Sequence, residues 1–146
     1  MIREAIAEDF ETILDMCATF WLDTQFTEPF DREHTRKMVQ MSLDHGLLIT
    51  AIEEGEVIGF MAAIKSPLLG SMAAWMATEL AWYVTPANRG KMAGIEMVLF
   101  LERLCKLQEV KYLNLAFMET SMPEQVKSMY KKLGYQLQET IYTKVL

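Results

Sequence analysis

The chain has 146 residues, of which 51% are hydrophobic, and carries a formal net charge of −6 with a pI near 5.0. This length and apolar content suit one compact domain, so we expect residues 1–146 to fold as a single domain. The acidic balance argues against nucleic acid or a membrane surface as the main partner, because both would repel the protein at long range. A neutral or cationic substrate fits better.

The first half of the chain predicts two helices and the start of a sheet. Ile2 to Glu4 is a short strand candidate, and apolar residues at helical spacing predict a helix over residues 8–22. Asp31 is a suitable cap for a second helix over residues 32–44, which ends at Gly46. The apolar runs at 47–52 and 57–64 flank a turn that contains Gly55, which indicates an antiparallel hairpin.

The second half alternates strands and helices. A long extended run over residues 73–84 ends before Pro86, a third helix follows over 92–107, and the next strand covers 111–117. Ser121 and Glu124 form a capping box for a fourth helix that ends at Gly134, and Tyr135 to Leu137 and Glu139 to Val145 read as two final strands. The order predicts an α/β fold of the α+β type, with a mixed, mostly antiparallel sheet of about six to seven strands and about four helices on both faces.

The turn between the long strand and the third helix is the most informative segment. A strand that turns into a helix leaves several backbone N–H groups pointing outward at the positive end of the helix dipole. Arg89 and Lys91 add positive charge there, and Gly90 and Gly94 allow a tight turn. We therefore expect a phosphate or pyrophosphate ligand, although solvated cations on a structural turn are the alternative. The spacing matches neither GxxxxGK[ST] nor GxGxxG.

The strand LAWYVTP, the turn NRGKMAG, the helix IEMVLFLERLCKL, the strand KYLNLAF and the closing MYKKLGY together resemble the GNAT superfamily of acyl-CoA-dependent N-acetyltransferases. The resemblance implies a GNAT-like sheet over nearly the whole chain, and acetyl-CoA as the co-substrate. It implies that the turn Arg89, Gly90, Lys91, Met92, Ala93 and Gly94 holds the pyrophosphate through backbone amides. Met92 departs from the pattern, since the family usually has glycine there, and its Cβ is expected to crowd the phosphates.

The same resemblance implies that the strand before the turn separates from its neighbour after a bulge. Free backbone groups of Trp82, Tyr83 and Val84 would then pair with the pantetheine arm almost as an added strand. The strand over residues 111–117 would form the other side of the opening.

Two residues are candidates for the chemistry of acetyl transfer, which needs a deprotonated amine, a polarised carbonyl and a proton for the leaving thiolate. The resemblance implies that Tyr130 lies near the thioester sulfur and donates that proton. The alternative interpretation is that Tyr130 is only a partly buried aromatic residue on the fourth helix. The family's asparagine seven residues before this tyrosine is Pro123 here. Glu79 is the candidate base, because an acid inside an apolar strand has a raised pKa; the alternative is that it faces solvent. Glu119, Thr120 and a water chain are weaker candidates for the base.

The acceptor amine is expected to bind near the first two helices, where the resemblance places acceptor specificity. Residues 1–35 contain nine acids and two bases, and they include Phe20, Trp21, Phe26 and Phe30. This composition suits an aromatic-walled pocket for a protonated amine, but aromatics at helical spacing are also typical of a core and acids of a solvated face. Small-molecule and protein amines both remain open.

The remaining reactive residues give no sign of a second chemistry. Cys17 and Cys105 lie in apolar helical patterns and are expected to be buried reduced thiols, while His34 and His45 have no matching ligand cluster, so no metal is expected. The N-terminal segment lacks the apolar core of a signal peptide, and we expect a soluble cytoplasmic protein.

The leading hypothesis is an N-acetyltransferase that moves the acetyl group of acetyl-CoA to a primary amine by direct attack. A non-catalytic binding or assembly module of the same fold, with Met92 and Pro123 as marks of a decayed cofactor site, is the alternative. A third reading uses the methionines of GSMAAWMATEL as an exposed surface, for example in a homodimer.

Overall fold

The computed structural model describes residues 1–118 and 122–146. They form two compact units, Met1–Ala116 and Phe117–Leu146, which are described separately.

The first unit is built on a five-stranded sheet in the order β1-β2-β3-β4-β5. Its strands are β1 (Ile2–Glu4), β2 (Leu48–Glu53), β3 (Glu56–Leu68), β4 (Ser71–Val84) and β5 (Val110–Asn114). The first four pair antiparallel with their neighbours, while β4 and β5 are parallel. The expected mixed, mostly antiparallel sheet is therefore present, but the expected number of strands was too high.

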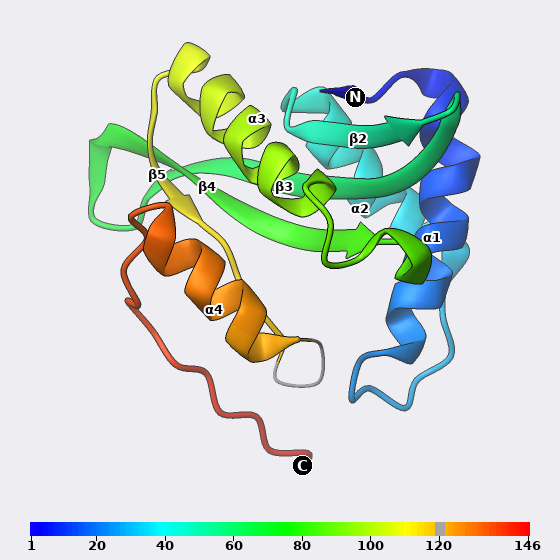
Figure 1. Cartoon of the computed structure of the whole chain (residues 1–146). Coiled ribbons are helices and arrows are strands. Elements are labelled where there is room, and N and C mark those ends of the chain that lie inside the picture. Colours follow the sequence, from blue (N-terminus) through cyan, green and yellow to red (C-terminus); the bar gives the residue numbers. More distant parts are fainter. Residues whose placement is uncertain (119–121) are drawn as a thin grey trace. The chain divides into compact units, whose positions relative to one another are not determined.

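Helices cover both faces of this sheet (Figure 1). Helices α1 (Phe10–Leu22) and α2 (Arg32–Asp44) lie on one face, and α3 (Ala93–Leu107) lies on the other. Under α1 and α2, a buried cluster contains Ile13, Leu14, Leu48, Phe60 and Tyr83. Because side chains alternate along a strand, the neighbours Ile49 and Met61 face α3, whose Met97, Val98 and Leu101 are fully buried.

Local capping explains where the first two helices begin and end. The Asp31 carboxylate accepts the N–H of His34, and Gly46 adopts a φ of +64° just beyond the helix, so α2 has the predicted bounds. Helix α1 begins at Phe10, two residues later than predicted, because Ala7–Asp9 form a 3-10 turn (η1). There the Asp9 carboxylate accepts the N–H of Ile6 and pairs with Arg3, which raises the pKa of Arg3.

Strands β3 and β4 are longer than predicted because they go on pairing with each other beyond the end of β2. This part of the two strands is called the arm, and β5 borders it on the β4 side. On the open edge of this arm, the N–H of Ala63 bonds to Leu47 O, and the N–H of Lys65 bonds to His45 Nδ1 at 3.0 Å. Since backbone groups on one edge recur every second residue, the next position on that edge is Pro67, which has no N–H.

The second unit contains helix α4 (Pro123–Lys132), with proline at its first position and Gly134 at a φ of +88° beyond its end. Ser121, Glu119 and Thr120 lie outside the described residues. The two predicted final strands were wrong: residues 135–146 form no strand, and Leu137, Ile141, Tyr142 and Val145 are exposed. An alternating pattern favours a strand, but a strand also needs a partner to which its backbone can bond.

Candidate functional site

The parallel strands β4 and β5 pair over a short distance and then part. Their register runs from Trp75 opposite Val110 to Thr78 opposite Asn114, and β5 ends there while β4 continues to Val84. Within the described residues, the β5 side of residues 80–84 therefore pairs with no strand. This is the separation that the resemblance implies.

A bulge in β4 lies at the start of this open stretch. Ala81 is opposite Ala62 of β3, whereas Glu79 is opposite Ala63, so Leu80 is an extra residue without a register partner. Without the bulge, Glu79 and Ala81 would share a face of the sheet. The extra residue places Glu79 on the opposite face, together with Ala63.

The Glu79 carboxylate bridges the two strands where they part. Its Oε2 accepts a hydrogen bond from the backbone N–H of Ala116, two residues beyond β5, at 3.1 Å. Burial raises the pKa of Glu79 from 4.5 to about 7, and the Ala116 N–H opposes this rise by stabilising the carboxylate. Glu79 is therefore a partly buried acid whose pKa lies near neutral pH.

The three residues expected to line the cofactor have different surroundings. The Trp82 side chain faces α3 and lies against Gly94, whereas Tyr83 is buried in the cluster under α1 and α2. The Val84 carbonyl accepts a hydrogen bond from Arg89 Nε at 2.9 Å. Any contact of Tyr83 with a ligand on the open edge must therefore come from its backbone.

The two glycines of the turn serve different purposes. Gly90 has a φ of +75°, which L side chains rarely adopt, and no atom lies within 4 Å of the position that a Cβ would take. A Cβ on Gly94 would lie 3.1 Å from Trp82 Cζ2. Gly90 is needed for backbone conformation, and Gly94 for close packing of α3 on β4.

The turn presents a run of backbone donors. After the short 3-10 turn η2 (Pro86–Asn88), helix α3 begins at Ala93, and its first closing bond runs from Glu96 N to Met92 O. Within the described residues, the N–H groups of residues 90–95 donate to no protein acceptor. Six consecutive free donors at a helix N-terminus form a suitable site for an anion.

Met92 does not obstruct this run of donors by its backbone conformation. It is the N-cap of α3, with φ −66° and ψ −22°, and its side chain is 60% exposed. That conformation is open to any residue, so the position does not require glycine here. Ala93 begins the helix with a small side chain.

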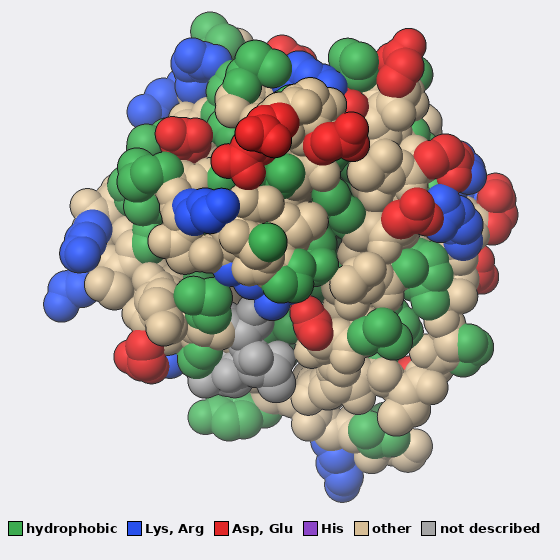
Figure 2. Space-filling view, turned by 45° about the vertical axis from the view of Figure 1, so that its right-hand side comes forward, with side chains coloured by type: hydrophobic (Ala, Val, Ile, Leu, Met, Phe, Trp, Pro, Cys, Tyr) green, Lys and Arg blue, Asp and Glu red, His purple; other side chains and the backbone are tan. Residues whose placement is uncertain are grey.

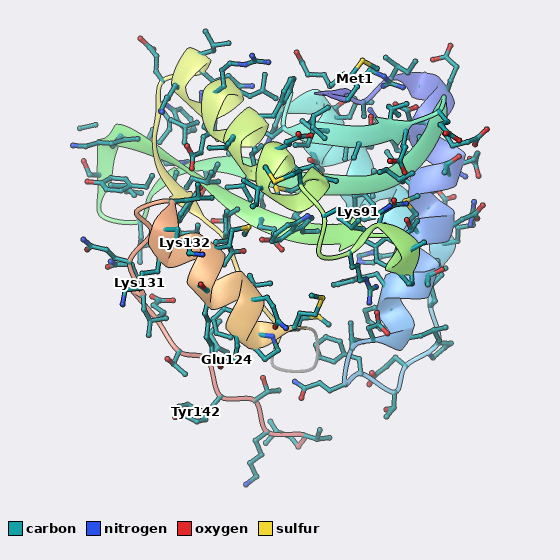
Figure 3. All side chains as sticks on the ribbon, in the orientation of Figure 1. Met1, Lys91, Glu124, Lys131, Lys132 and Tyr142 are labelled. Carbon is teal, nitrogen blue, oxygen red and sulfur yellow. The ribbon has the colours of Figure 1, made fainter. Side chains whose placement is uncertain are left out.

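The two cations of the turn are already engaged. The Arg89 guanidinium donates to Val84 O, lies 3.5 Å from Asp23 Oδ2 and stacks over the Tyr83 ring. Lys91 Nζ donates to Asn88 Oδ1 at 2.7 Å and lies beside the start of α3 (Figure 3). Arg89 thus ties the turn to the end of α1, and Lys91 is the cation on the exposed side of the turn.

Tyr130 belongs to the second unit. It is buried on α4, and its ring centroid lies 5.4 Å from that of Tyr135. Pro123 begins the same helix.

The expected acceptor region contains one aromatic pair and a network of ion pairs. Trp21 and Phe26 stack with centroids 5.4 Å apart, and Trp21 Nε1 donates to Glu28 O, while Phe20 and Phe30 pack against the core. Figure 2 brings this side forward and shows acidic side chains beside basic ones at its right-hand edge.

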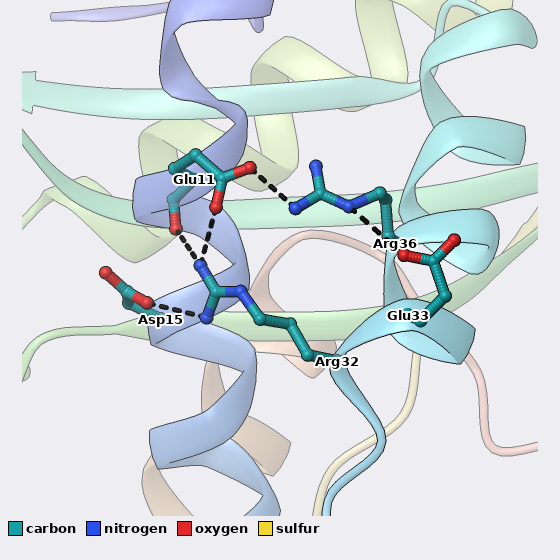
Figure 4. Close-up of polar contacts among 5 residues, drawn as sticks. All are labelled: Glu11, Asp15, Arg32, Glu33 and Arg36. Carbon is teal, nitrogen blue, oxygen red and sulfur yellow. Dashed lines mark hydrogen bonds and ion pairs between the residues drawn. The ribbon is translucent and has the colours of Figure 1, made fainter.

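Much of the acidity in this region is neutralised locally. Arg32 pairs with both Glu11 and Asp15, and Arg36 pairs with Glu11 and Glu33 (Figure 4). The pairs that Arg32 and Arg36 make with Glu11 and Asp15 join α1 to α2, and the bonds from Arg32 and Arg36 lower the pKa of Glu11. The carboxylates of α1 therefore support the helix pair and are poor candidates for a free cation site.

Neither cysteine is suited to act as a nucleophile. Both thiols are buried, and burial raises the pKa of Cys17 to about 12 and that of Cys105 to about 11. No group of three or more potential metal ligands occurs among the residues that the structure describes. Within the same residues, every helix is too short or too polar to cross a membrane.

Sequence reasoning missed the bond between Glu79 and Ala116 and the tie between Arg89 and Asp23. Both join residues far apart in the chain. For the bond between Glu79 and Ala116, the only sequence signal was an acid inside an apolar strand. For the pair of Arg89 and Asp23, the signal was a carboxylate at the C-terminal end of a helix, where it is unfavourable unless a cation lies nearby.

Solved structures with the same fold span nearly the whole chain. A transcriptional regulator from Bacillus halodurans C-125 aligns with a TM-score of 0.76 at 21% identity, covering 100% of this chain and 99% of that one. A predicted acetyltransferase with acetyl-CoA from Clostridium acetobutylicum aligns with a TM-score of 0.76 at 18% identity, covering 99% and 95%. A ribosomal-protein-alanine N-acetyltransferase from Brucella melitensis biovar Abortus 2308 aligns at 0.74 and 16%, covering 100% and 99%.

No curated protein matches the sequence. The model of the acetyltransferase (GNAT) family matches residues 10–135, which include the bulged strand, the donor turn and Tyr130. The chain therefore belongs to the GNAT family of acetyltransferases.

Proposed function

We propose that this protein transfers an acetyl group from acetyl-CoA to a primary amine by direct attack of the amine. Family membership supports acetyl transfer in general, and the observation that carries the finer proposal is Glu79, an acid of raised pKa at the mouth of the opening between β4 and β5. Acetyl-CoA supplies the activated acetyl group and a thiolate that leaves.

The residues of the turn hold the cofactor in this proposal. The free N–H groups of residues 90–95 bind the pyrophosphate, Lys91 adds charge, and the β5 side of Trp82, Tyr83 and Val84 pairs with the pantetheine arm. Arg89, Gly90, Met92, Ala93 and Gly94 shape the turn. The exposure of the Met92 side chain supports cofactor binding against the alternative of a decayed site.

The chemistry is divided between two side chains. Glu79 takes the proton that the acceptor ammonium must lose, so that an N–H bond breaks and an O–H bond forms on the carboxylate. The amine nitrogen then forms a C–N bond as the C–S bond breaks, and Tyr130 gives its phenolic proton to the departing thiolate, a role assigned from the family resemblance. The second proton that the nitrogen loses as the amide forms restores the phenol through solvent. The acceptor is a small-molecule amine or a protein amine.

Titration calorimetry with acetyl-CoA, followed by an amine-acceptor screen, tests the proposal. We expect saturable binding in the wild type, in Glu79→Gln and in Tyr130→Phe, with turnover lost or strongly reduced in both variants. Binding without turnover on any amine would favour a non-catalytic binding module, and absence of binding at millimolar acetyl-CoA would overturn the proposal.

We also propose a homodimer formed through the arm of β3 and β4. Leu69, Met72 and Trp75 are exposed large apolar side chains near its tip. Sedimentation at low and high protein concentration tests this: the wild type should dimerise, Met72→Lys should not, and a monomer at all concentrations would refute it.

A further inference from the structure

We propose that the hydrogen bond between the Glu79 carboxylate and Ala116 holds β4 to the chain beyond β5 at the point where the two strands part. We propose further that protonation of the carboxylate weakens this bond. The opening would then widen when Glu79 is protonated. This inference rests on the proposed function only in naming the acceptor ammonium as the source of that proton.

The position of the bond supports a fastening role. Up to Thr78 and Asn114, the two strands pair through their backbones. Beyond that point, the bond from Ala116 N–H to Glu79 Oε2 takes the place of a backbone bond, with a side chain on one partner. The bulge at Leu80 is what places Glu79 on the face from which it makes this bond.

The two oxygens of the Glu79 carboxylate have different surroundings. Oε2 is held by Ala116, while Oε1 takes no hydrogen bond from any residue that the structure describes. A proton from an acceptor amine can therefore reach the carboxylate without displacing Ala116 first. Once the carboxylate is neutral it becomes a weaker acceptor, because hydrogen bonds to ionised groups are about twice as strong as neutral ones.

The titration belongs to Glu79 alone. Ala63 opposite it on β3 and Ala116 beyond β5 do not titrate, and no charged side chain contributes to its raised pKa, which comes from burial and is opposed by the Ala116 N–H. The charged groups on the elements packed against β4 are Glu56 and Lys65 on β3, Lys111 on β5, Glu96, Glu102, Arg103 and Lys106 on α3, and Glu11 and Asp15 on α1.

Amide NMR of the full chain tests the inference without an activity assay. We would measure the chemical shift and the hydrogen-exchange protection of the Ala116 amide from about pH 5.5 to about pH 8.5, on both sides of the Glu79 pKa. The wild type should show a transition near pH 7, with protection about fivefold greater at the high end, while Leu113 and Asn114 serve as internal references. In Glu79→Gln the Ala116 amide should stay weakly protected throughout.

Two further variants complete the design. Glu79→Asp, whose side chain is one methylene shorter, should also lose the protection, while Glu56→Gln removes an exposed carboxylate on β3 and should retain the wild-type transition. Equal Ala116 protection at both ends of the pH range in the wild type, or unchanged protection in folded Glu79→Gln, would overturn the inference. If that variant fails to fold, the wild-type titration decides alone. If the Ala116 amide shows the expected transition but the protein transfers no acetyl group, the role of the hydrogen bond stands and only the proposed chemistry is rejected.

Discussion

The indole of Trp82 occupies the space that a side chain on Gly94 would need, since a Cβ there would lie 3.1 Å from Cζ2. We predict that Gly94→Ala lowers the free energy of unfolding by about 1 to 3 kcal/mol and weakens acetyl-CoA binding, because α3 must move away from β4. Chemical denaturation and calorimetry measure the two effects. Trp82→Phe should relieve the clash, so the double variant should lose less free energy of unfolding than the sum of the losses in the two single variants. If the two losses simply add, the clash between Trp82 and the new Cβ is not the cause of the destabilisation.

Glu79 should make the protein less stable at alkaline pH. Its pKa rises from 4.5 to about 7 on folding, so the folded state holds the proton more tightly. The associated stability is fully present below about pH 4.5 and is lost as the pH rises through about 7, by up to roughly 3 kcal/mol.

Thermal denaturation of the wild type and Glu79→Gln across this range measures the effect. Above about pH 7, the variant should be at least as stable as the wild type. Its stability should also lack the part of the pH dependence that comes from Glu79. A wild type whose stability is flat between these values would contradict the prediction.

Arg89 should act on the cofactor through the shape of the turn, while Lys91 acts through its charge. Arg89 is held by Val84 O, Asp23 and the Tyr83 ring, whereas Lys91 is exposed. We predict that Lys91→Ala weakens acetyl-CoA binding in a salt-dependent manner, by a few-fold to about tenfold at low ionic strength.

Arg89→Ala should instead destabilise the fold and weaken binding with little dependence on salt. Asp23→Asn, which removes one of its partners, should reproduce a part of that loss. Calorimetry at low and high salt separates the cases, and a strongly salt-dependent loss in Arg89→Ala would show that its guanidinium reaches the phosphates.

His45 should stabilise the base of the arm. Its Nδ1 accepts the N–H of Lys65, which lies on the edge of β3 beyond the last residue paired with β2, so His45→Ala leaves that donor without its acceptor. We predict a loss of about 1 to 2 kcal/mol in the free energy of unfolding. His34→Ala, an exposed histidine on the same helix, is the matched control and should change little. Equal effects would mean that the bond to Lys65 contributes nothing measurable.

The parts of the fold that sequence predicted well depend on neighbours in the chain. Asp31 and Gly46 set the bounds of α2 through local capping, and Gly134 marks the end of α4 in the same way. The arm and the end of β5 depend on distant partners, such as His45 for Lys65 and Glu79 for Ala116. A pattern of alternation contains no information on those partners, which is also why two strands were wrongly predicted at residues 135–145.

The candidate site divides along the same line. The turn with its free amides follows from a strand, two glycines and a helix in sequence, so this run of donors was predictable. The orientation of Arg89 toward Asp23 was not, because it depends on where α1 ends in space. Met92 was expected to crowd the turn, and its ordinary helical conformation and exposed side chain give no backbone reason for that expectation.

The edge of the β3 and β4 arm has a consequence for how copies of this protein meet in a crowded cell. An exposed strand edge invites another chain to add itself by backbone pairing, which is a common first step toward aggregation. Here the donors of Ala63 and Lys65 are already used within the chain, and Pro67 has none to offer. Copies that meet at this arm therefore gain no backbone donors from these positions, so their association depends more on exposed side chains such as Leu69 and Met72.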